Sequence, residues 1–408
     1  DEAGVASEDW TLDALNNGRA HTVAWSGAAC DLNNDGTPEL LASSYGRSPN
    51  HLFRGVRAGD EVTFENISVS SGYAWDGRND WTDNESARCY CKLHRDAPDC
   101  DGVPEPRLIR CTTENDVFRW RHQSDREPFR LGGNSGATIC ADINNDGWID
   151  LLTTEIVHFD VGGSSDPSEL VINTGSDDIV LERPGNETTG LTRDRQLVAW
   201  NDGDITGGVF DFDNDGWQDV YIGSTDYPGA RGLFYRQDAP LSFSEIAIES
   251  GIENNRSHGM AIADFDRDGD LDVILGHSRS RCAAGQEPDP TPCYETTQVR
   301  FFENTFGQDS QWVQLTLVGG DGTNRSAVGA RATVTAKGEA TIVQMQDVDG
   351  GHGHFGAQRD LTLHFGLADA CKAEVTVRWP DAALTEQTFV VQAGARYLVV
   401  QGEDPERQ

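Results

Sequence analysis

The sequence has almost no lysine and no long apolar run. Of its 408 residues only Lys92, Lys337 and Lys372 are lysines, and 32 basic side chains stand against 68 acidic ones, a formal charge of −36. Nucleic-acid binding and polybasic membrane anchoring both need basic surface, so this balance argues against either class. No run of about 18 apolar residues occurs, which excludes a helix inserted across a membrane. The first residues carry no apolar signal core, so we expect a mature or an intracellular chain.

Composition also gives little support for helices. Hydrophobic residues make up 37% of the chain, and Asp, Asn and the 44 glycines favour turns and ligand loops. The length predicts two or three domains. Together these observations predict a loop-rich, all-β protein.

Cysteine, by contrast, is abundant. Nine cysteines are many for a reducing compartment, so we expect an oxidising one and a secreted or extracellular protein, periplasmic or on the cell surface if bacterial. Cys282 and Cys293 flank a proline-rich loop, as a disulfide would. Cys30 and Cys140 each precede an equivalent acidic loop and would meet if those loops are neighbours, which leaves Cys371 unpaired.

A second group of cysteines, Cys89, Cys91, Cys100 and Cys111, allows two interpretations. Two disulfides would pin an insertion, whereas four thiolates would bind zinc. Zinc sites usually show two to four residues between paired cysteines, and the Cys-x-Cys spacing here is tighter. Two disulfides are therefore favoured.

Four nine-residue segments align without gaps, at residues 31–39, 142–150, 211–219 and 264–272. Each follows a small, Gly- or Ala-rich stretch and precedes a short apolar run, which predicts a strand, an acidic turn and a second strand. Their starts lie 111, 69 and 53 residues apart, so we expect a degenerate unit within residues 75–133. Five units of about four short strands each predict the blades of a β-propeller.

The repeat stops near residue 304, and a second all-β region follows. We therefore divide the chain into a propeller at residues 1–308 and a small β-sandwich or barrel-like domain at residues 309–408. Its predicted strands lie at residues 312–318, 330–336, 341–346, 361–365, 373–379, 387–391 and 396–400.

The acidic segments share the pattern Asp-x-[Asp/Asn]-x-Asp-Gly-x-x-[Asp/Glu], which suits calcium. Calcium takes about 6–8 oxygen ligands, and a tight loop can aim alternate side chains inward, with Gly at position 6 permitting the reversal. An EF-hand closes with Glu at position 12 between helices, so the acid at position 9 between strands argues against it. Ordinary turn chemistry is the alternative, but four matched copies favour about four Ca²⁺ ions.

The predicted metal ligands are the residues at positions 1, 3, 5, 7 (through its carbonyl) and 9 of each segment. They are Asp31, Asn33, Asp35, Thr37 and Glu39; Asp142, Asn144, Asp146, Trp148 and Asp150; Asp211, Asp213, Asp215, Trp217 and Asp219; and Asp264, Asp266, Asp268, Asp270 and Asp272. The ligand carboxylates number three, three, four and four, so we expect the last two segments to bind more tightly.

These segments resemble the FG-GAP/VCBS repeats of integrin-α-like propellers. The stretches NRSAVGARATVTA (residues 324–336), LHFGL (363–367) and VTVRWP (375–380) resemble the ASPIC/UnbV domain. Together they resemble the cartilage acidic protein family and its bacterial relatives. The resemblance implies a secreted, calcium-bound propeller, often of seven blades, so five visible units would mean that two blades have lost their loops or that the tail completes the ring.

Other motifs offer weaker sites. His352 and His354 would hold a transition metal or a glycan, although a Gly-rich loop explains them better. Residues 275–280 imitate a nucleophile elbow but have Ser280 where the second Gly belongs. Trp75, Trp81 and Trp120 would offer sugars an aromatic surface, although packing in a core is the simpler interpretation.

No catalytic residue and no organic cofactor site is predicted. The leading hypothesis is a calcium-binding module that binds extracellular protein or glycan partners. The alternative is a calcium-dependent enzyme that acts on a carbohydrate or small substrate in the propeller channel. A purely structural adhesion component is a third possibility.

Overall fold

The computed structural model describes residues 3–5, 10–18, 20, 22–59, 61–112, 120–195, 197–282, 290–352 and 359–408. Strands account for 40% of the chain and helices for 9%, which confirms the all-β prediction. Within the described ranges, the helices are all too short or too polar to cross a bilayer.

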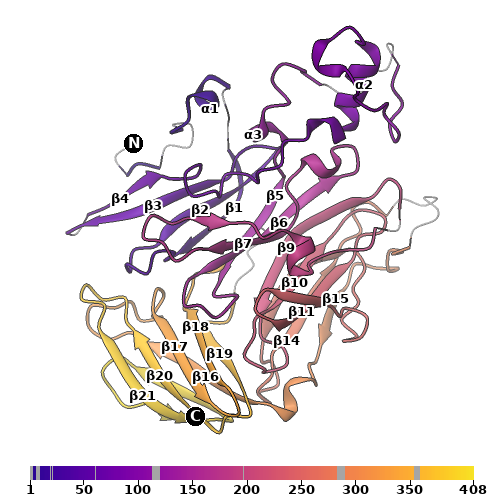
Figure 1. The fold of residues 1–408 in the computed structure, drawn as a ribbon. Coiled ribbons are helices and arrows are strands. Elements are labelled where there is room, and N and C mark those ends of the chain that lie inside the picture. Colours follow the sequence, from indigo (N-terminus) through magenta and orange to yellow (C-terminus); the bar gives the residue numbers. More distant parts are fainter. Residues whose placement is uncertain are drawn as a thin grey trace.

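Four successive groups of antiparallel strands, which we call units 1 to 4, make up the first three-quarters of the chain, and units 2 and 3 share one eight-stranded sheet (Figure 1). In each unit consecutive strands pair as neighbours, as the repeat predicted. Unit 1 contains β1 (Val23–Cys30), β2 (Glu39–Tyr45), β3 (His51–Ala58) and β4 (Glu61–Asn66); unit 2 contains β5 (Ser135–Ala141), β6 (Asp150–His158), β7 (Glu169–Asn173) and β8 (Leu181–Glu182); unit 3 contains β9 (Asn201–Phe210), β10 (Asp219–Ser224), β11 (Gly232–Ala239) and β12 (Ser242–Glu245); and unit 4 contains β13 (Ser257–Ala263), β14 (Asp272–His277) and β15 (Val299–Phe302).

The first strands of the units lie side by side, so that β1 packs against β5, β5 against β9 and β9 against β13. The small residues before each acidic loop make this close approach possible. A Cβ on Gly136 of β5 would lie 2.5 Å from Cα of Ile205 in β9, which is closer than real side chains come. The units thus form a half-barrel, and β6 and β9 pair across the boundary between units 2 and 3.

The expected fifth unit is wrong. The described part of residues 75–133 contains helical segments and no strand: η1 (Trp81–Asp83), α2 (Glu85–Leu93), η2 (Pro98–Cys100) and α3 (Pro128–Leu131). The Asn84 side chain accepts hydrogen bonds from two backbone N–H groups and caps α2, which favours a helix over a strand. The long first spacing therefore comes from an insertion. Four units are described, and the closed propeller of five or seven blades stays unconfirmed.

Two disulfides, Cys89–Cys111 and Cys91–Cys100, staple this insertion, so the favoured interpretation of the cysteine cluster is confirmed over zinc. Trp81 lies 6.4 Å from Trp120 and packs against the Cys91–Cys100 pair. Its indole therefore belongs to a local core. A small domain segment with few apolar residues gains most of its order from such cross-links.

The remaining short helices are α1 (Asp13–Gly18), η3 (Gly162–Ser164), α4 (Asn186–Thr189) and η4 (Gly307–Asp309). The C-terminal region is a sandwich of two four-stranded sheets, and all seven strands predicted there are present. One sheet contains β19 (Thr362–Ala368), β16 (Gln311–Val318), β22 (Ala395–Val400) and β23 (Glu406–Arg407); the other contains β18 (Thr341–Asp347), β17 (Arg331–Lys337), β20 (Lys372–Arg378) and β21 (Glu386–Gln392).

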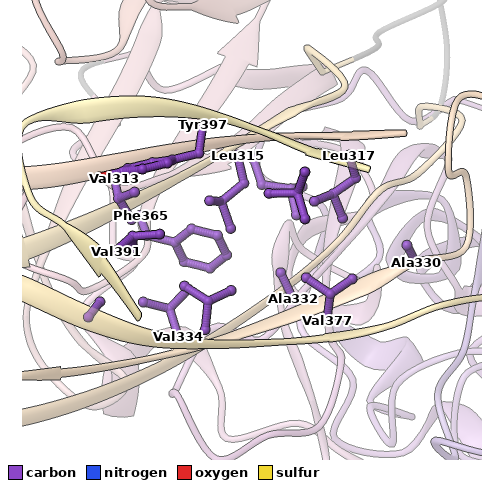
Figure 2. Close-up of a cluster of buried hydrophobic side chains, with 14 of the residues drawn as sticks. Val313, Leu315, Leu317, Ala330, Ala332, Val334, Phe365, Val377, Val391 and Tyr397 are labelled. Atoms are coloured by element: carbon purple, nitrogen blue, oxygen red, sulfur yellow. The ribbon is translucent and has the colours of Figure 1, made fainter. Parts of the chain in front are cut away.

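Alternating apolar residues form the core between the two sheets of this sandwich. Figure 2 shows Leu315 of β16 and Phe365 of β19 facing Val334 of β17 and Val377 of β20. These side chains are fully buried. Every second residue of a strand points to the same face, so the alternation of apolar and polar residues along these strands builds the core.

The other two expected cysteine pairs are also present. Cys30 bonds to Cys140 across 110 residues of sequence, and Cys282 bonds to Cys293. Cys371 is free and exposed, as predicted. Since Cys30 ends β1 and Cys140 lies in β5, the first disulfide ties unit 1 to unit 2 directly before their acidic loops.

We predict that the double variant Cys30→Ser/Cys140→Ser lowers the free energy of unfolding by about 2–5 kcal/mol, because the disulfide closes a long loop in the unfolded chain. Denaturant unfolding of the oxidised protein measures this loss. Cys371→Ser is the matched control, because it removes a free, exposed thiol, and it should leave the curve unchanged. Equal stability of the double variant and the control would contradict the prediction.

Candidate metal centre at the four acidic loops

Four loops of nine residues, which we call loops 1 to 4 (residues 31–39, 142–150, 211–219 and 264–272), join the first and second strands of units 1 to 4. The structure places all the predicted ligand residues in these loops. Because each second strand begins at position 9 of its loop, all four loops lie at the same end of their sheets. The sequence pattern thus predicted both the local turn and its repetition.

Two carboxylates fold each loop. The carboxylate at position 1 accepts a hydrogen bond from the N–H of the glycine at position 6, as in Gly216 to Asp211 at 2.8 Å. The carboxylate at position 5 accepts from the N–H of position 7, as in Trp217 to Asp215 at 2.8 Å. The glycines at position 6 have φ between 82° and 101°, which other residues adopt only under strain. The same bonds recur in loops 1, 2 and 4.

The carboxylate at position 9 connects the end of each loop to its start and to the third strand. One oxygen of Asp219 accepts from the N–H of Phe212 at position 2, at 3.0 Å. The other accepts from the N–H of Gln237 in the third strand, at 2.8 Å. Carboxylate oxygens have two lone pairs each, so Asp219 keeps the capacity to bind a cation as well.

Several buried carboxylate oxygens in these loops have no hydrogen-bond partner. They are Oδ1 of Asp31, Oδ1 of Asp213, Oδ1 of Asp264 and both oxygens of Asp270. In loops 3 and 4, oxygens of the residues at positions 1, 3 and 9 all lie within 4.8 Å of one another. A buried carboxylate oxygen without a donor is costly, so the loops fit a bound cation.

Burial also changes the acidity of the loop carboxylates. Burial raises the pKa of Glu39 to about 8 and that of Asp150 to about 8, and the neighbouring acids add to the shift. Burial and the charges of Asp215 and Asp213 raise the pKa of Asp211 well above its usual value. A buried carboxylate beside other acids is protonated, paired with a cationic side chain or bound to a metal cation. The side-chain atoms that these loops offer to a metal are all oxygens, which suit calcium.

An amide side chain in each of units 2, 3 and 4 links the loop of that unit to the loop of the unit before it. Asn173, at the end of β7, donates to the carbonyl of Leu32 in loop 1 and to that of Ile149 in its own loop 2, at 2.8 and 3.1 Å. Gln237 and Asn304 make the equivalent bonds in units 3 and 4. Sequence reasoning missed these residues. Their only signal is a recurring amide residue at the end of the third strand.

The C-terminal sandwich covers the loop end of the half-barrel (Figure 1). Topology requires this, since β15 runs antiparallel to β14 and the chain therefore leaves unit 4 at its loop end. Arg378 pairs with Asp31 at position 1 of loop 1, at 2.5 Å. Arg396 pairs with Asp264 at position 1 of loop 4, at 2.7 Å. The two outermost loops thus share a carboxylate with an arginine of the sandwich.

Loop 3 contacts the sandwich through β19. His364 lies 2.6 Å from Oδ1 of Asn214, and burial lowers the pKa of His364 to about 4, so it is neutral. Gly366 approaches so closely that a Cβ there would lie 2.1 Å from Oδ2 of Asp211. Arg331, Arg378, His364 and Gly366 all belong to the C-terminal sequence motifs described above, so those motifs mark the surface that docks on the loops.

The other candidate residues do not build a second site. Nε2 of His352 lies 3.0 Å from Oδ2 of Asp349, and His354 lies outside the described residues. Ser278 and Ser280, in the segment that imitates a nucleophile elbow, both donate to Asp226, so their hydroxyls hold a loop in place. Neither segment gains support as a catalytic or metal site.

We predict that Arg378→Ala weakens the attachment of the sandwich by about 2–5 kcal/mol, because it removes the nearer of the two arginines beside the buried Asp31 carboxylate and leaves only Arg331, at 4.0 Å. Calorimetric unfolding should show an earlier transition, and limited proteolysis should release the sandwich sooner. Arg325→Ala, an exposed arginine of the same domain, is the matched control. Indistinguishable proteolysis of the two variants would show that the pair does not hold the domains together.

Known protein families match both the repeat region and the C-terminal domain of this chain. The ASPIC and UnbV family model matches residues 320–406, and the FG-GAP-like repeat model matches residues 211–275, which contain loops 3 and 4. Cartilage acidic protein 1 of Xenopus tropicalis is 27% identical over 180 residues, 43% of this chain and 25% of that protein. The mouse (Mus musculus) protein of the same name is 26% identical over 184 residues, 44% of this chain and 26% of that protein.

The matched region thus spans only about a quarter of the length of these relatives. A solved structure from Bacteroides uniformis, described as a candidate cell adhesion protein, overlaps 51% of this chain and 91% of its own, at 13% identity. Its TM-score is 0.15, so it carries no argument. The chain carries an FG-GAP-like repeat followed by an ASPIC and UnbV domain, and it is a distant relative of cartilage acidic protein 1.

Proposed function

We propose that this protein is an extracellular calcium-binding module that binds protein or glycan partners at the end of the half-barrel opposite the loops. The observation that carries the proposal is the set of four oxygen-lined loops, each with buried carboxylates that their hydrogen bonds do not fully satisfy. The half-barrel would then be part of a calcium-stabilised, propeller-like scaffold.

In each loop the side chains at positions 1, 3, 5 and 9 and the carbonyl at position 7 would hold the ion. Calcium would supply two positive charges where the loop concentrates three or four negative ones. Its role would be structural, since the loops fix the ends of the first and second strands of every unit. Loops 3 and 4, with Asp rather than Asn at position 3, would bind more tightly.

Two observations support an extracellular location. Four disulfides cross-link the chain, and disulfides persist in oxidising compartments. The relatives are named for cartilage, a tissue made largely of extracellular matrix. The strongly acidic charge of −36 would keep such a protein soluble in a calcium-containing fluid.

The end opposite the loops is the better partner surface, because the sandwich already covers the loop end. Tyr45, at the end of β2, is exposed and stacks on Trp25 at 4.1 Å. Across the same end, the Arg281 guanidinium lies 4.6 Å from the ring of Tyr227. Aromatic rings with an arginine beside them suit sugars and protein side chains alike.

The alternative of an enzyme with a central channel finds less support. The cavity between half-barrel and sandwich, lined among others by Asp264, Asp347 and Arg396, has a volume of about 70 Å³. Ligand sites are usually about 300–1,000 Å³. Arg396 is already paired with Asp264 across the two domains, and Asp347 is paired with Arg331 within the sandwich, so both side chains already have charged partners.

We predict that removing calcium lowers the melting temperature substantially. A single loop saturated at 100 times its dissociation constant contributes about 2.7 kcal/mol to stability, and that contribution disappears in excess EGTA. Differential scanning calorimetry with calcium, with magnesium and with EGTA measures it. Asp213→Asn should reduce the calcium-dependent part of the shift, whereas Asp178→Asn, at a side chain 91% exposed, should not. An identical melting curve in calcium and EGTA would sink the calcium proposal.

We predict that Tyr45→Ala/Tyr227→Ala loses at least about 10-fold in affinity for any partner found on a glycan array or a panel of extracellular matrix proteins, since aromatic anchors dominate such interfaces. Phe306→Ala, an exposed aromatic residue at the loop end, is the control and should bind normally. If the double variant binds the partner as tightly as the wild type does, the partner site is not at Tyr45 and Tyr227. Turnover of a sugar substrate without stable binding would favour the enzyme.

A further inference from the structure

Position 4 of each acidic loop is not among the predicted ligands, yet it has a constant conformation. Asn34, Asn145, Asn214 and Arg267 occupy it in loops 1 to 4. All four have left-handed backbones, with φ of 61°, 59°, 59° and 69°. Asn tolerates this conformation better than other non-glycine residues, which would explain three of the four by turn chemistry alone.

The side chains of the three asparagines have a further role. Asn34 in loop 1 donates from Nδ2 to the carbonyl of Gly147 in loop 2, at 3.1 Å. Asn145 in loop 2 donates to the carbonyl of Gly216 in loop 3, at 2.8 Å. Asn214 in loop 3 donates to the carbonyl of Gly269 in loop 4, at 3.1 Å. Each loop therefore contacts the next one at the same two positions, from 4 to 6. We call these bonds the amide row.

The carbonyl that receives each bond belongs to the peptide unit between positions 6 and 7. The N–H of that same peptide donates to the carboxylate at position 5, as Trp217 does to Asp215. A hydrogen bond to the carbonyl polarises the peptide and strengthens the bond that its N–H donates. The asparagine of one loop thereby holds a ligand carboxylate of the next loop in place.

The orientation of the first and third of these amides is determined by their other contacts. Arg331 donates to Oδ1 of Asn34, and His364 lies 2.6 Å from Oδ1 of Asn214. The guanidinium accepts no hydrogen bond, so Nδ2 of Asn34 must face the carbonyl. Aspartate would place a second acceptor against that carbonyl. The row thus requires an amide and not merely a residue that tolerates a left-handed backbone.

The row ends where the loops end. Arg267 has the same conformation in loop 4, but no fifth loop follows within the described residues, and its side chain is exposed. The exception at position 4 therefore coincides with the absence of an acceptor. This coincidence separates a coupling role from simple turn chemistry.

We propose that Asn34, Asn145 and Asn214 are positioning residues that couple the four loops, so that a cation bound in one loop favours binding in its neighbour. The inference rests on the proposed calcium binding. It gives a role to direct contacts between loops whose bonded residues are 71 residues apart (loop 2 to loop 3) and 55 residues apart (loop 3 to loop 4) along the chain. Coupling between sites by shared hydrogen bonds makes binding cooperative.

The test is Asn145→Gly, which removes the amide at the middle of the row while glycine keeps the left-handed backbone without strain. Arg267→Gly is the matched control, with the same backbone and no acceptor to lose. Calcium titration by isothermal calorimetry should give the wild type and the control a Hill coefficient above about 1. Asn145→Gly should split the isotherm into two classes and weaken binding in loop 3 by about 2- to 10-fold, the equivalent of one ordinary hydrogen bond.

Hydrogen exchange at the Trp217 amide gives a second readout in EGTA, where no cation takes part. It should be faster in Asn145→Gly than in Arg267→Gly. Equal isotherms and equal exchange in the two variants would overturn the coupling and leave calcium binding intact. A wild type that binds no calcium would overturn both the proposed function and the cation coupling. Circular dichroism of both variants confirms that they fold.

Discussion

Buried carboxylates, gathered at one end of the four units, are the constraint on which the rest of this structure depends. Like charges held away from water need hydrogen bonds, paired cations or protons. Three kinds of partner meet the need here: N–H groups within each loop, a backbone N–H from or just after the third strand of the unit, and arginines of the sandwich. A bound cation would be the fourth. The turn geometry, the order of the units and the docking of the sandwich are therefore parts of one solution to one electrostatic problem.

The same constraint divides the molecule into two ends with different tasks. The loop end is internal, because the sandwich contacts loops 1, 3 and 4 through Arg378, His364 and Arg396. The opposite end carries the disulfide-stapled insertion and the connections between second and third strands. An insertion at that end leaves the loops undisturbed, so residues can be added there at little cost to the fold.

Much of this architecture could be predicted from the sequence, and the exceptions have physical reasons. Loop geometry was predictable because each loop is completed within nine residues. The sandwich strands were predictable because alternation reports a buried face. The prediction of a fifth unit was wrong because spacing alone cannot distinguish a degenerate repeat from an insertion. The helix-capping residue Asn84 and the closely spaced cysteines were local signs of a disulfide-linked helix.

Contacts between loops were not predictable, since Asn145 and Gly216 are 71 residues apart and an asparagine in a turn needs no other explanation. The motif arginines were visible, but Arg378 meets Asn34 across 344 residues, and no spacing rule gives that pairing. Sequence motifs showed which residues matter in the tail. Only the structure shows that they matter for contact with the other domain.

The arginine at position 4 of the last loop has a consequence for how such an array can grow during evolution. A duplicated unit added after unit 4 would begin next to Arg267, which offers no amide to the new loop, and would meet the surface that the sandwich already occupies. A copy of an interior unit would instead bring an asparagine that can donate to the next loop and a glycine carbonyl that can accept from the loop before it. Arrays of this type should therefore lengthen from within, with the final repeat and its C-terminal cover inherited together.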